Sequence, residues 1–327
     1  MFEGDKYTSV ISHMEDLSNS ALKINLDCIR SSLIKKDASG KTLLVPVFSR
    51  TYGMLINDDL FKKEGISVPS TWNELLNACE SFKTKGYKSP MMGYTLKSSS
   101  CFMNTIAYPI FVAELAKNSE ALAKANNLDP EAGEYMRSAL EAVDTLVKNG
   151  CVDTKECDGI QDNYDKVILR FFEGDVPMRA CAGDTVSGTK KRESKSEAYT
   201  ASPFSYSFIP IPSNHEGGYF IDSPSIEFSV NKYCDNLDMT NEFMRFLISN
   251  SELNNMASIK RLVSPTKVMS LDSVYAPFGN VPANRTFSPE VLGITDALSV
   301  QLRIASYKVG KGEITIDEAI SMYGSFK

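Results

Sequence analysis

The chain has 327 residues, a length that fits one or two domains. Hydrophobic residues make up 43% of it and charged residues 23%, a globular composition that excludes a disordered or collagen-like chain. The net charge of −6 implies no basic surface for phosphate backbones or anionic lipid, which argues against nucleic acid as a partner. The longest apolar runs, 43–48 and 106–116, fall short of the roughly 20 residues that a membrane span needs.

The N-terminus and the cysteines bear on the compartment. The first seven residues contain no basic stretch followed by an apolar one, so no secretory signal is found there. Seven cysteines are scattered without a CxxC pair, which argues against a zinc or disulfide framework and favours buried, thiol-bearing core residues. Cys151 and Cys157 are close enough in sequence to form a bridge, an alternative that the sequence leaves open.

The first predicted elements are two short strands and two helices. The β-rich runs 42–47 and 52–56 predict strands. A helix over 58–64 is closed by Gly65. Thr71 and Glu74 form a capping box, and apolar residues at helical spacing after it predict a helix over 72–85, with Trp72 in the core.

The middle of the chain alternates a long helix with two strands. Asp129 and Pro130 supply an N-cap and a first-turn proline for a helix over 130–149. Strands are predicted at 176–181 and 206–211. Between them, the segment 185–202 is rich in Lys, Ser, Glu and Thr, a composition that predicts a mobile surface excursion.

The last third contains a strand and three helical segments. The run 225–230 predicts a strand, and 238–249 a helix with Met239, Phe243, Phe246 and Leu247 facing inward. Ser288 and Pro289 open a helical segment towards Val309, and a capping box from Thr315 to Glu318 begins a short terminal helix. Strands that alternate with helices predict an α/β layered architecture.

Common catalytic and metal-binding signatures are absent from the sequence. Only two histidines are present, which leaves little material for a histidine metal site or a Ser-His-Asp triad. No GxSxG, GxxxxGK[ST], GxGxxG or HExxH motif occurs. The carboxylates Asp158, Asp162 and Asp165 lack the glycine and terminal glutamate of a calcium loop. We therefore expect no catalytic residues, no metal and no cofactor.

From Lys41 onwards the chain resembles the carbohydrate-binding, maltodextrin-binding-like class of solute-binding proteins of ABC importers. The resemblance depends on motifs in a fixed order: VPVF at 45–48, GMLINDDLFKKEGI at 53–66, PSTWNEL at 69–75, FFEGDVPM at 171–178 and the run 236–257 followed by Pro265. Ile56 stands where this class usually has a tyrosine. Each motif alone is also a helix cap, a turn or a strand end, so the order is what indicates the family.

The resemblance implies a type II periplasmic-binding-protein-like fold, in which two discontinuous α/β lobes are linked by a hinge and bind the ligand in the cleft between them. We expect residues 1–47 and 224–266 to form the first lobe, and 48–223 and 267–327 the second. The first lobe is then incomplete. We expect a strand-helix-strand unit, the export signal and the lipid-attachment cysteine to precede Met1, and an exposed apolar edge on the first lobe to promote self-association.

The resemblance also predicts which residues touch the ligand. A sugar needs flat aromatic surfaces beside directional polar groups. The predicted contacts come from four segments of the chain: Ser49, Arg50 and Tyr52; Lys97 and Ser98; Asp184 and Thr185; and Tyr206, Tyr219 and Asp222. Arg50 stands where maltodextrin-binding members have an acidic contact, and the usual stacking tryptophan after Gly183 is absent, so a more polar ligand or one held by tyrosines is expected.

The function implied is a non-catalytic receptor that binds a carbohydrate or oligosaccharide and delivers it to the subunits of an ABC permease. We expect an extracytoplasmic protein, a cell-surface lipoprotein or periplasmic, that is a monomer when complete. Three alternatives stay open. They are a receptor for another polar solute, a ligand-sensing module of a signalling system, and a glycoside hydrolase with two carboxylates about 5 to 9.5 Å apart.

Overall fold

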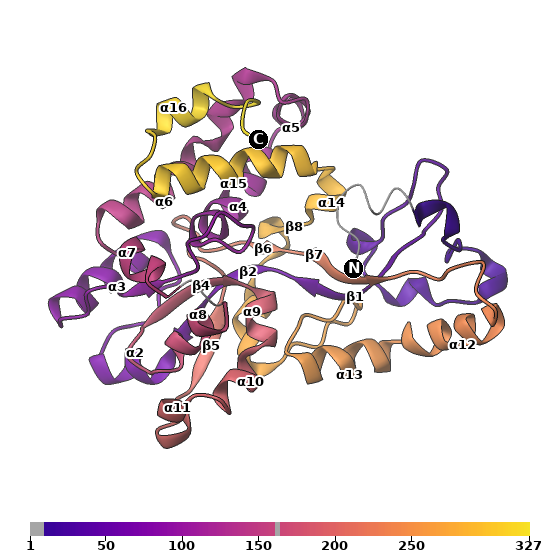
Figure 1. The fold of residues 1–327 in the computed structure, drawn as a ribbon, viewed down its shortest axis with the longest axis horizontal. Coiled ribbons are helices and arrows are strands. Elements are labelled where there is room, and N and C mark those ends of the chain that lie inside the picture. Colours follow the sequence, from indigo (N-terminus) through magenta and orange to yellow (C-terminus); the bar gives the residue numbers. More distant parts are fainter. Residues whose placement is uncertain (1–9, 161–163) are drawn as a thin grey trace. The chain divides into compact units, whose positions relative to one another are not determined.

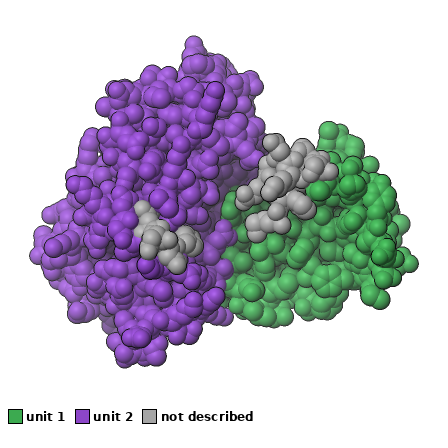
Figure 2. Space-filling view, viewed as in Figure 1, with its two compact units in different colours: residues 1–50, 222–272 green, residues 51–221, 273–327 purple. Residues whose placement is uncertain are grey.

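The computed structural model describes residues 10–160 and 164–327, and within them two compact units. Unit 1 comprises the residues up to Arg50 and Asp222–Asp272, and unit 2 comprises Thr51–Ile221 and Ser273–Lys327 (Figure 2). The chain therefore crosses between units after residues 50, 221 and 272, where the sequence predicted crossings after 47, 223 and 266. The first seven residues, in which no export signal was found, and Asp162 lie outside the described residues.

Unit 1 is built on a two-stranded antiparallel sheet. In it β1 (Val45–Arg50) pairs with β7 (Ser223–Phe228), so that Val45 faces Phe228 and Arg50 faces Ser223. Its helices are the 3-10 turns η1 (Ile11–His13), η2 (Ser20–Leu22), η3 (Leu26–Cys28) and η4 (Ser31–Leu33), with α12 (Leu237–Leu247) and α13 (Asn250–Lys260). Side chains from β1, η3, η4, α12 and α13 join one apolar core, which includes Leu33, Val47, Leu247 and Leu253.

One apolar face of α12 is exposed, which contradicts the predicted inward orientation of three side chains. Met239 is 72% exposed, Phe243 55% and Phe246 59%, whereas Met244 and Leu247 are buried. The helix carries apolar residues on two faces, and a helix on the surface of a small core buries only one of them. Contiguous exposed apolar side chains of this kind favour association.

We expect the chain to self-associate through this face. Replacing Phe243 and Phe246 by glutamate should lower the weight-average mass measured by light scattering after size exclusion, because charged side chains cannot be buried unpaired between two apolar faces. Val291, which is 68% exposed in unit 2, provides the control, and Val291→Glu should leave the mass unchanged. A wild-type chain that elutes as a monomer at every concentration would contradict the prediction.

The sheet of unit 2 has four strands in the order β3-β4-β2-β5. They are β2 (Tyr52–Asn57), β3 (Met91–Met92), β4 (Met178–Ala182) and β5 (Tyr206–Ile209). β2 is antiparallel to both β4 and β5, whereas β3 and β4 are parallel. β6 (Phe220–Ile221) and β8 (Thr286–Phe287) form a separate parallel pair. The strands predicted at 52–56, 176–181 and 206–211 are confirmed with small shifts of their ends.

Helices surround this sheet. α4 (Phe102–Leu115) packs on β2 and β4, and α4, α6 (Arg137–Lys148) and α15 (Asp296–Gly310) pack on one another (Figure 1). The others are α2 (Asp58–Glu64), α3 (Trp72–Thr84), α5 (Ser119–Asn126), α7 (Thr154–Asp158), α8 (Tyr164–Phe171), α9 (Gly183–Ser187), α10 (Thr189–Glu193), α11 (Glu197–Ala201), α14 (Pro289–Leu292) and α16 (Ile316–Ser321), with the 3-10 segments η5 (Pro130–Met136), η6 (Ser273–Asn280) and η7 (Ala283–Arg285).

Helix caps confirm several predicted boundaries. Both reciprocal hydrogen bonds of a capping box form at Thr71 and at Thr315, at the starts of α3 and α16. Gly65 ends α2 with a φ of 68°, a conformation that glycine adopts without strain. Trp72 is only half-buried, so its predicted place in the core is wrong.

Three predicted segments differ from the structure. The helix expected over 130–149 begins as η5, where Gly133 lets the backbone of Ile320 approach: a Cβ on Gly133 would lie 2.2 Å from that carbonyl oxygen. The segment expected from 289 to 309 is split by Gly293, whose φ is 73°. The prediction of a mobile segment at 185–202 is wrong, because it folds into most of α9 and all of α10 and α11, and the Ser196 hydroxyl both caps α11 and donates to the carbonyl oxygen of Phe172 at 3.0 Å.

Candidate functional site

One edge of the unit 2 sheet gathers polar loops and the chain crossings. Because β3 and β4 are parallel, their carboxyl ends lie at the same edge, and the antiparallel β2 begins there with Tyr52. Ligands of open α/β sheets bind outside the carboxyl ends of the strands. We call this the crossing edge; it comprises Thr51, Tyr52, Gly183, Asp184, Thr185 and Ile221.

Hydrogen bonds hold the crossing edge together. The Thr51 carbonyl oxygen accepts from the backbone N–H of Gly183 at 2.9 Å, and the Thr51 hydroxyl accepts from the N–H of Ile221 at 3.2 Å. The Tyr275 hydroxyl in η6 donates to the carbonyl oxygen of Gly183 at 3.4 Å. The start of β2, the end of β4 and the end of β6 are therefore fixed against one another before any ligand arrives.

An aromatic pair lies at the start of β2. The rings of Tyr52 and Tyr108 have centroids 5.1 Å apart and are tilted by 52°, and their residues are 7% and 9% exposed. Tyr108 belongs to α4 and was not among the predicted ligand residues. The only signal for it in the sequence is a tyrosine inside the apolar run 106–116, where a hydroxyl needs a polar or wet neighbour.

Of the two predicted ligand residues after β4, one is exposed and the other is buried. Asp184, in the first turn of α9, is exposed, and its carboxylate is at the crossing edge. Thr185 is 1% exposed, and its hydroxyl hydrogen-bonds the Cys181 thiol, whose pKa burial raises to about 11. The geometry therefore leaves Asp184 accessible to a solute and gives Thr185 a packing role, while ligand contact by either stays a prediction.

The loop after β3 carries Lys97 and Ser98. Lys97 is exposed, and the buried Ser98 Oγ has no hydrogen-bond partner among the described residues. Asn104, at the start of α4, donates to the Ser99 carbonyl oxygen at 3.0 Å, while its Oδ1 is buried and likewise without a described partner. Because β3 and β4 are parallel, this loop leaves the sheet towards the crossing edge.

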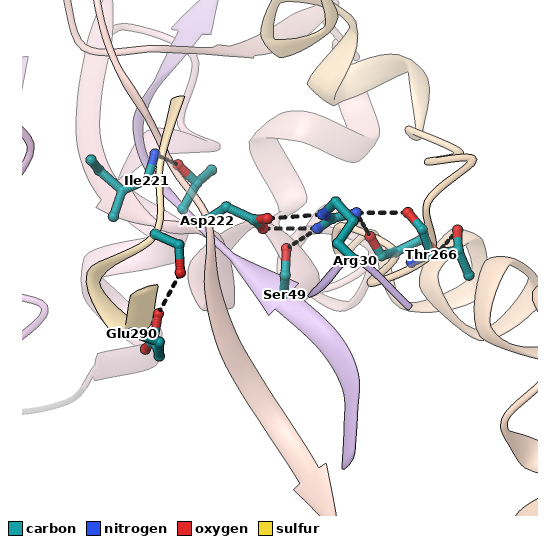
Figure 3. A network of polar contacts seen from close by, with 9 residues as sticks. Arg30, Ser49, Ile221, Asp222, Thr266 and Glu290 are labelled. Atoms are coloured by element: carbon teal, nitrogen blue, oxygen red, sulfur yellow. Dashed lines mark hydrogen bonds and ion pairs between the residues drawn. The ribbon is translucent and has the colours of Figure 1, made fainter. Parts of the chain in front are cut away.

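Arg30 binds two of the predicted ligand residues of unit 1, Asp222 and Ser49 (Figure 3). The Asp222 carboxylate accepts from Arg30 Nε and Nη2, both at 2.8 Å, and the Ser49 hydroxyl accepts from Nη2 at 3.1 Å. Arg30 Nη1 donates to the carbonyl oxygens of Ser264 at 2.7 Å and Thr266 at 2.9 Å. All five N–H donors of the guanidinium are thus used within unit 1.

This network fixes the unit 1 ends of two of the three crossing segments, at Ser49 and Asp222. Ser49 and Asp222 are 0% and 3% exposed, so their side chains serve the unit 1 interior in this structure. Arg50, the last residue of β1, is half-buried and lies opposite Ser223 in the sheet. The sequence did not single out Arg30, since a lone arginine between 3-10 turns carries no motif.

Tyr206 lies apart from the Tyr52 side chain, and Tyr219 is bonded within its own loop. Tyr206 pairs with Asn57, five residues along β2 from Tyr52, a distance of about 16 Å at the rise of a strand. Its hydroxyl donates to Glu193, and its ring packs with Phe171 and Phe172. Tyr219 precedes β6, and its hydroxyl accepts from Asn214 Nδ2 at 2.7 Å. The structure therefore does not bring Tyr206 to the crossing edge.

The acidic residues near Asp158 were predicted not to form a metal site. Asp158 interacts with Thr95 and Lys311, and Asp165 with Arg192 and Lys195. Within residues 10–160 and 164–327, no group of three or more His, Cys, Asp and Glu side chains has the arrangement to hold a metal ion. No helix in those ranges is both long and apolar enough to cross a membrane.

Solved structures share the fold of this chain. RafE of Streptococcus pneumoniae in its apo form is 16% identical with a TM-score of 0.72, and the match covers 98% of this chain and 79% of RafE. A chitin oligosaccharide binding protein is 17% identical with a TM-score of 0.74, over 98% and 79% of the two chains. A sugar transporter of Bacillus licheniformis in complex with stachyose is 13% identical with a TM-score of 0.69, over 98% and 82%.

Sequence comparison identifies the family. No curated protein matches the chain in sequence. Residues 6–283 match the family described as bacterial extracellular solute-binding proteins, which are carriers rather than enzymes. The predicted resemblance and the α/β solute-binding fold are therefore confirmed. By this match over most of its length, the chain belongs to the bacterial extracellular solute-binding protein family.

Proposed function

We propose that the chain is the receptor of an ABC importer for a carbohydrate or oligosaccharide, which it delivers to a membrane permease. We propose a carbohydrate because of the residues at the crossing edge. The Tyr52–Tyr108 pair lies at the start of β2, and the Asp184 carboxylate lies at the end of the adjacent β4. Sugars are recognised by aromatic faces beside directional polar groups. The similar structures include RafE in complex with raffinose and a sugar transporter in complex with stachyose.

Within this proposal, several of the predicted residues contact the sugar together with Tyr108. The exposed Asp184 accepts from sugar hydroxyls, and the exposed Lys97 and the half-buried Ser98 are the proposed contacts from the loop after β3. Tyr52 and Tyr108 are the proposed aromatic contacts, through the 7% and 9% of their surface that is exposed. Arg50 is the proposed contact from unit 1. Ser49, Thr185 and Asp222 are buried and are sequence neighbours of Arg50, Asp184 and Ile221, and Tyr219 precedes β6. We place the receptor outside the cytoplasm, as a cell-surface lipoprotein or a periplasmic protein.

Thermal unfolding with a panel of mono- and oligosaccharides tests the solute class. A sugar that binds only the folded chain must raise the unfolding midpoint. At a hundredfold excess over Kd it adds about 2.7 kcal/mol to the free energy of unfolding. We expect a rise with at least one oligosaccharide. A panel of sugars without effect, alongside a rise with an amino acid or another polar solute, would overturn the carbohydrate assignment and keep the receptor assignment.

Asp184→Asn should weaken binding of that sugar about tenfold in isothermal titration, because a charge-assisted hydrogen bond contributes roughly 1.5 to 3 kcal/mol and the amide retains part of it. Asp184 is exposed, so the fold should be unaffected. The matched control is Asp296→Asn, an exposed first-turn aspartate of α15 in the same unit, which should leave Kd unchanged. Equal affinities of the two variants would remove Asp184 from the site.

A further inference from the structure

Two of the seven cysteines lie against each other in unit 2. Cys79 belongs to α3, Cys151 follows α6, and their thiols share a hydrogen bond. Both residues are buried, at 0% and 1% exposure. The bridge between Cys151 and Cys157 that the sequence left open is not favoured, because Cys157 in α7 hydrogen-bonds the backbone of Gly93 instead.

The backbone on both sides of the pair is held by other contacts. The N–H of Cys151 donates to the Leu146 carbonyl oxygen at 2.9 Å, and its own carbonyl oxygen accepts from the N–H of Met91 at 2.8 Å. Lys83, one turn after Cys79 in α3, donates from Nζ to the Asn149 carbonyl oxygen at 2.8 Å. A disulfide requires two backbones that are already close, and the hydrogen bond from Lys83 to Asn149 links α3 to the segment of Cys151 independently of the thiols.

A pocket gives access to one member of the pair. Its volume is about 360 Å³, and it is lined by Leu76, Asn77, Glu80, Lys83, Asn149 and Cys151. Cys79 is not part of the lining. A small reagent that enters therefore meets Cys151 first, beside the Lys83 ammonium group.

The two thiols also differ in acidity. The hydrogen bond from Cys79 lowers the pKa of Cys151, and the Lys83 charge lowers it further against the opposing effect of burial. The same hydrogen bond and burial raise the pKa of Cys79. The thiol that lines the pocket is thus the one whose pKa is lowered, and a thiolate is the attacking species in disulfide exchange.

We propose that Cys79 and Cys151 are a redox pair, which a low-molecular-weight disulfide such as oxidised glutathione converts to an intramolecular disulfide. The Cys151 thiolate attacks one glutathione sulfur, forms a mixed disulfide and releases one glutathione thiolate. That thiolate takes the Cys79 proton, and the Cys79 sulfur attacks Cys151 Sγ and releases the second glutathione. Two protein thiols are oxidised and one disulfide is reduced to two thiols. Disulfides persist outside the cytoplasm, where this family acts.

The remaining cysteines have other neighbours. Cys101 bonds Met103 Sδ, Cys28 the Ile248 carbonyl oxygen, and Cys234 the Thr240 hydroxyl. Burial raises the pKa of Cys101, Cys157 and Cys181 to about 11 each. The four buried thiols, Cys28, Cys101, Cys157 and Cys181, should therefore stay reduced under conditions that oxidise the pair, and Cys234, which is half-buried against Thr240, should form no bridge.

Thiol counting by mass spectrometry tests the proposal. The reduced chain, which has seven cysteines, is incubated with oxidised glutathione, alkylated in denaturant and digested. We expect the thiols of Cys79 and Cys151 to be lost and one cross-linked peptide to contain both residues. The oxidised chain should unfold at a midpoint at least about 3 °C above the reduced chain, because the bridge closes a long loop. Seven remaining thiols, or a bridge between other cysteines, would overturn the proposal.

Single variants separate the two roles. Cys79→Ser should stop at the mixed disulfide and retain glutathione on Cys151, whereas Cys151→Ser should leave Cys79 unmodified. Cys181→Ser, in the buried strand β4, is the matched control and should form the bridge as the wild type does. Glutathione on Cys79 in the Cys151→Ser chain would contradict the assigned order of attack. If a variant fails to fold, the wild-type thiol count alone decides.

Discussion

Replacing Arg30 by methionine should lower the free energy of unfolding of unit 1 by about 3 to 5 kcal/mol, because it leaves a buried carboxylate without its partner. The Asp222 side chain is 4% exposed and that of Arg30 18%, so water replaces little of the lost interaction. The substitution also removes the donors to Ser49 and to the carbonyl oxygens of Ser264 and Thr266. Urea unfolding followed by far-UV circular dichroism measures the loss.

The single tryptophan separates the two units in this experiment. Trp72 belongs to unit 2, so its fluorescence transition should move less than the circular dichroism transition. Arg137→Met is the matched control. It removes an arginine whose side chain is 37% exposed and paired with Glu134 and Asp317, and should cost less than about 1 kcal/mol. The double variant Arg30→Met with Asp222→Leu should recover part of the stability. If Arg30→Met and Arg137→Met lower the free energy of unfolding equally, the hydrogen-bond network of Arg30 is not buried.

Gly53→Ala should destabilise unit 2 by about 1 to 3 kcal/mol, because the second residue of β2 has no room for a methyl group. An added Cβ would lie 2.5 Å from Phe208 Cζ and 2.7 Å from the carbonyl oxygen of Ile209, both on the neighbouring strand β5. The ring can rotate away, but the backbone oxygen cannot move without disturbing the ladder between β2 and β5. Trp72 fluorescence during urea unfolding reports this loss.

Gly159 provides the control for this substitution. Its φ is −63°, and an added Cβ would lie no closer than 3.4 Å to its nearest neighbour, the carbonyl oxygen of Glu156. Gly159→Ala should therefore leave the unfolding free energy within about 0.5 kcal/mol of the wild type. If Gly53→Ala proves as mild as Gly159→Ala, the close approach of β5 to β2 is not as tight as described.

Local signals predicted much of the secondary structure. The caps at Thr71, Gly65 and Thr315 depend on neighbours within a few residues, and each confirmed a helix end. The errors arose where a distant contact decided the outcome. The segment 185–202 has the composition of a loop, yet hydrogen bonds and ion pairs to α8 and its C-terminal end hold it in helices.

The candidate site was predicted in part, since motifs mark loops but not the partners of side chains. The order of the motifs in the sequence led to Tyr52 and Asp184, which the structure places at one sheet edge. It could not show that Ser49 and Asp222 are bonded to Arg30, because the hydrogen-bonded pair Arg30 and Asp222 lies far apart in the chain. Tyr108 was missed for the same reason, as its contact with Tyr52 links a helix to a distant strand.

The sequence by itself determined the family and the kinds of elements, because ordered motifs, caps and apolar spacing are local and each is read within one segment. Only the tertiary structure decided which face of α12 is exposed, which carboxylate Arg30 binds and which thiol lies beside Cys151. These outcomes depend on packing between segments distant in sequence. The free energy of such a contact comes from burial and geometry that no single segment contains.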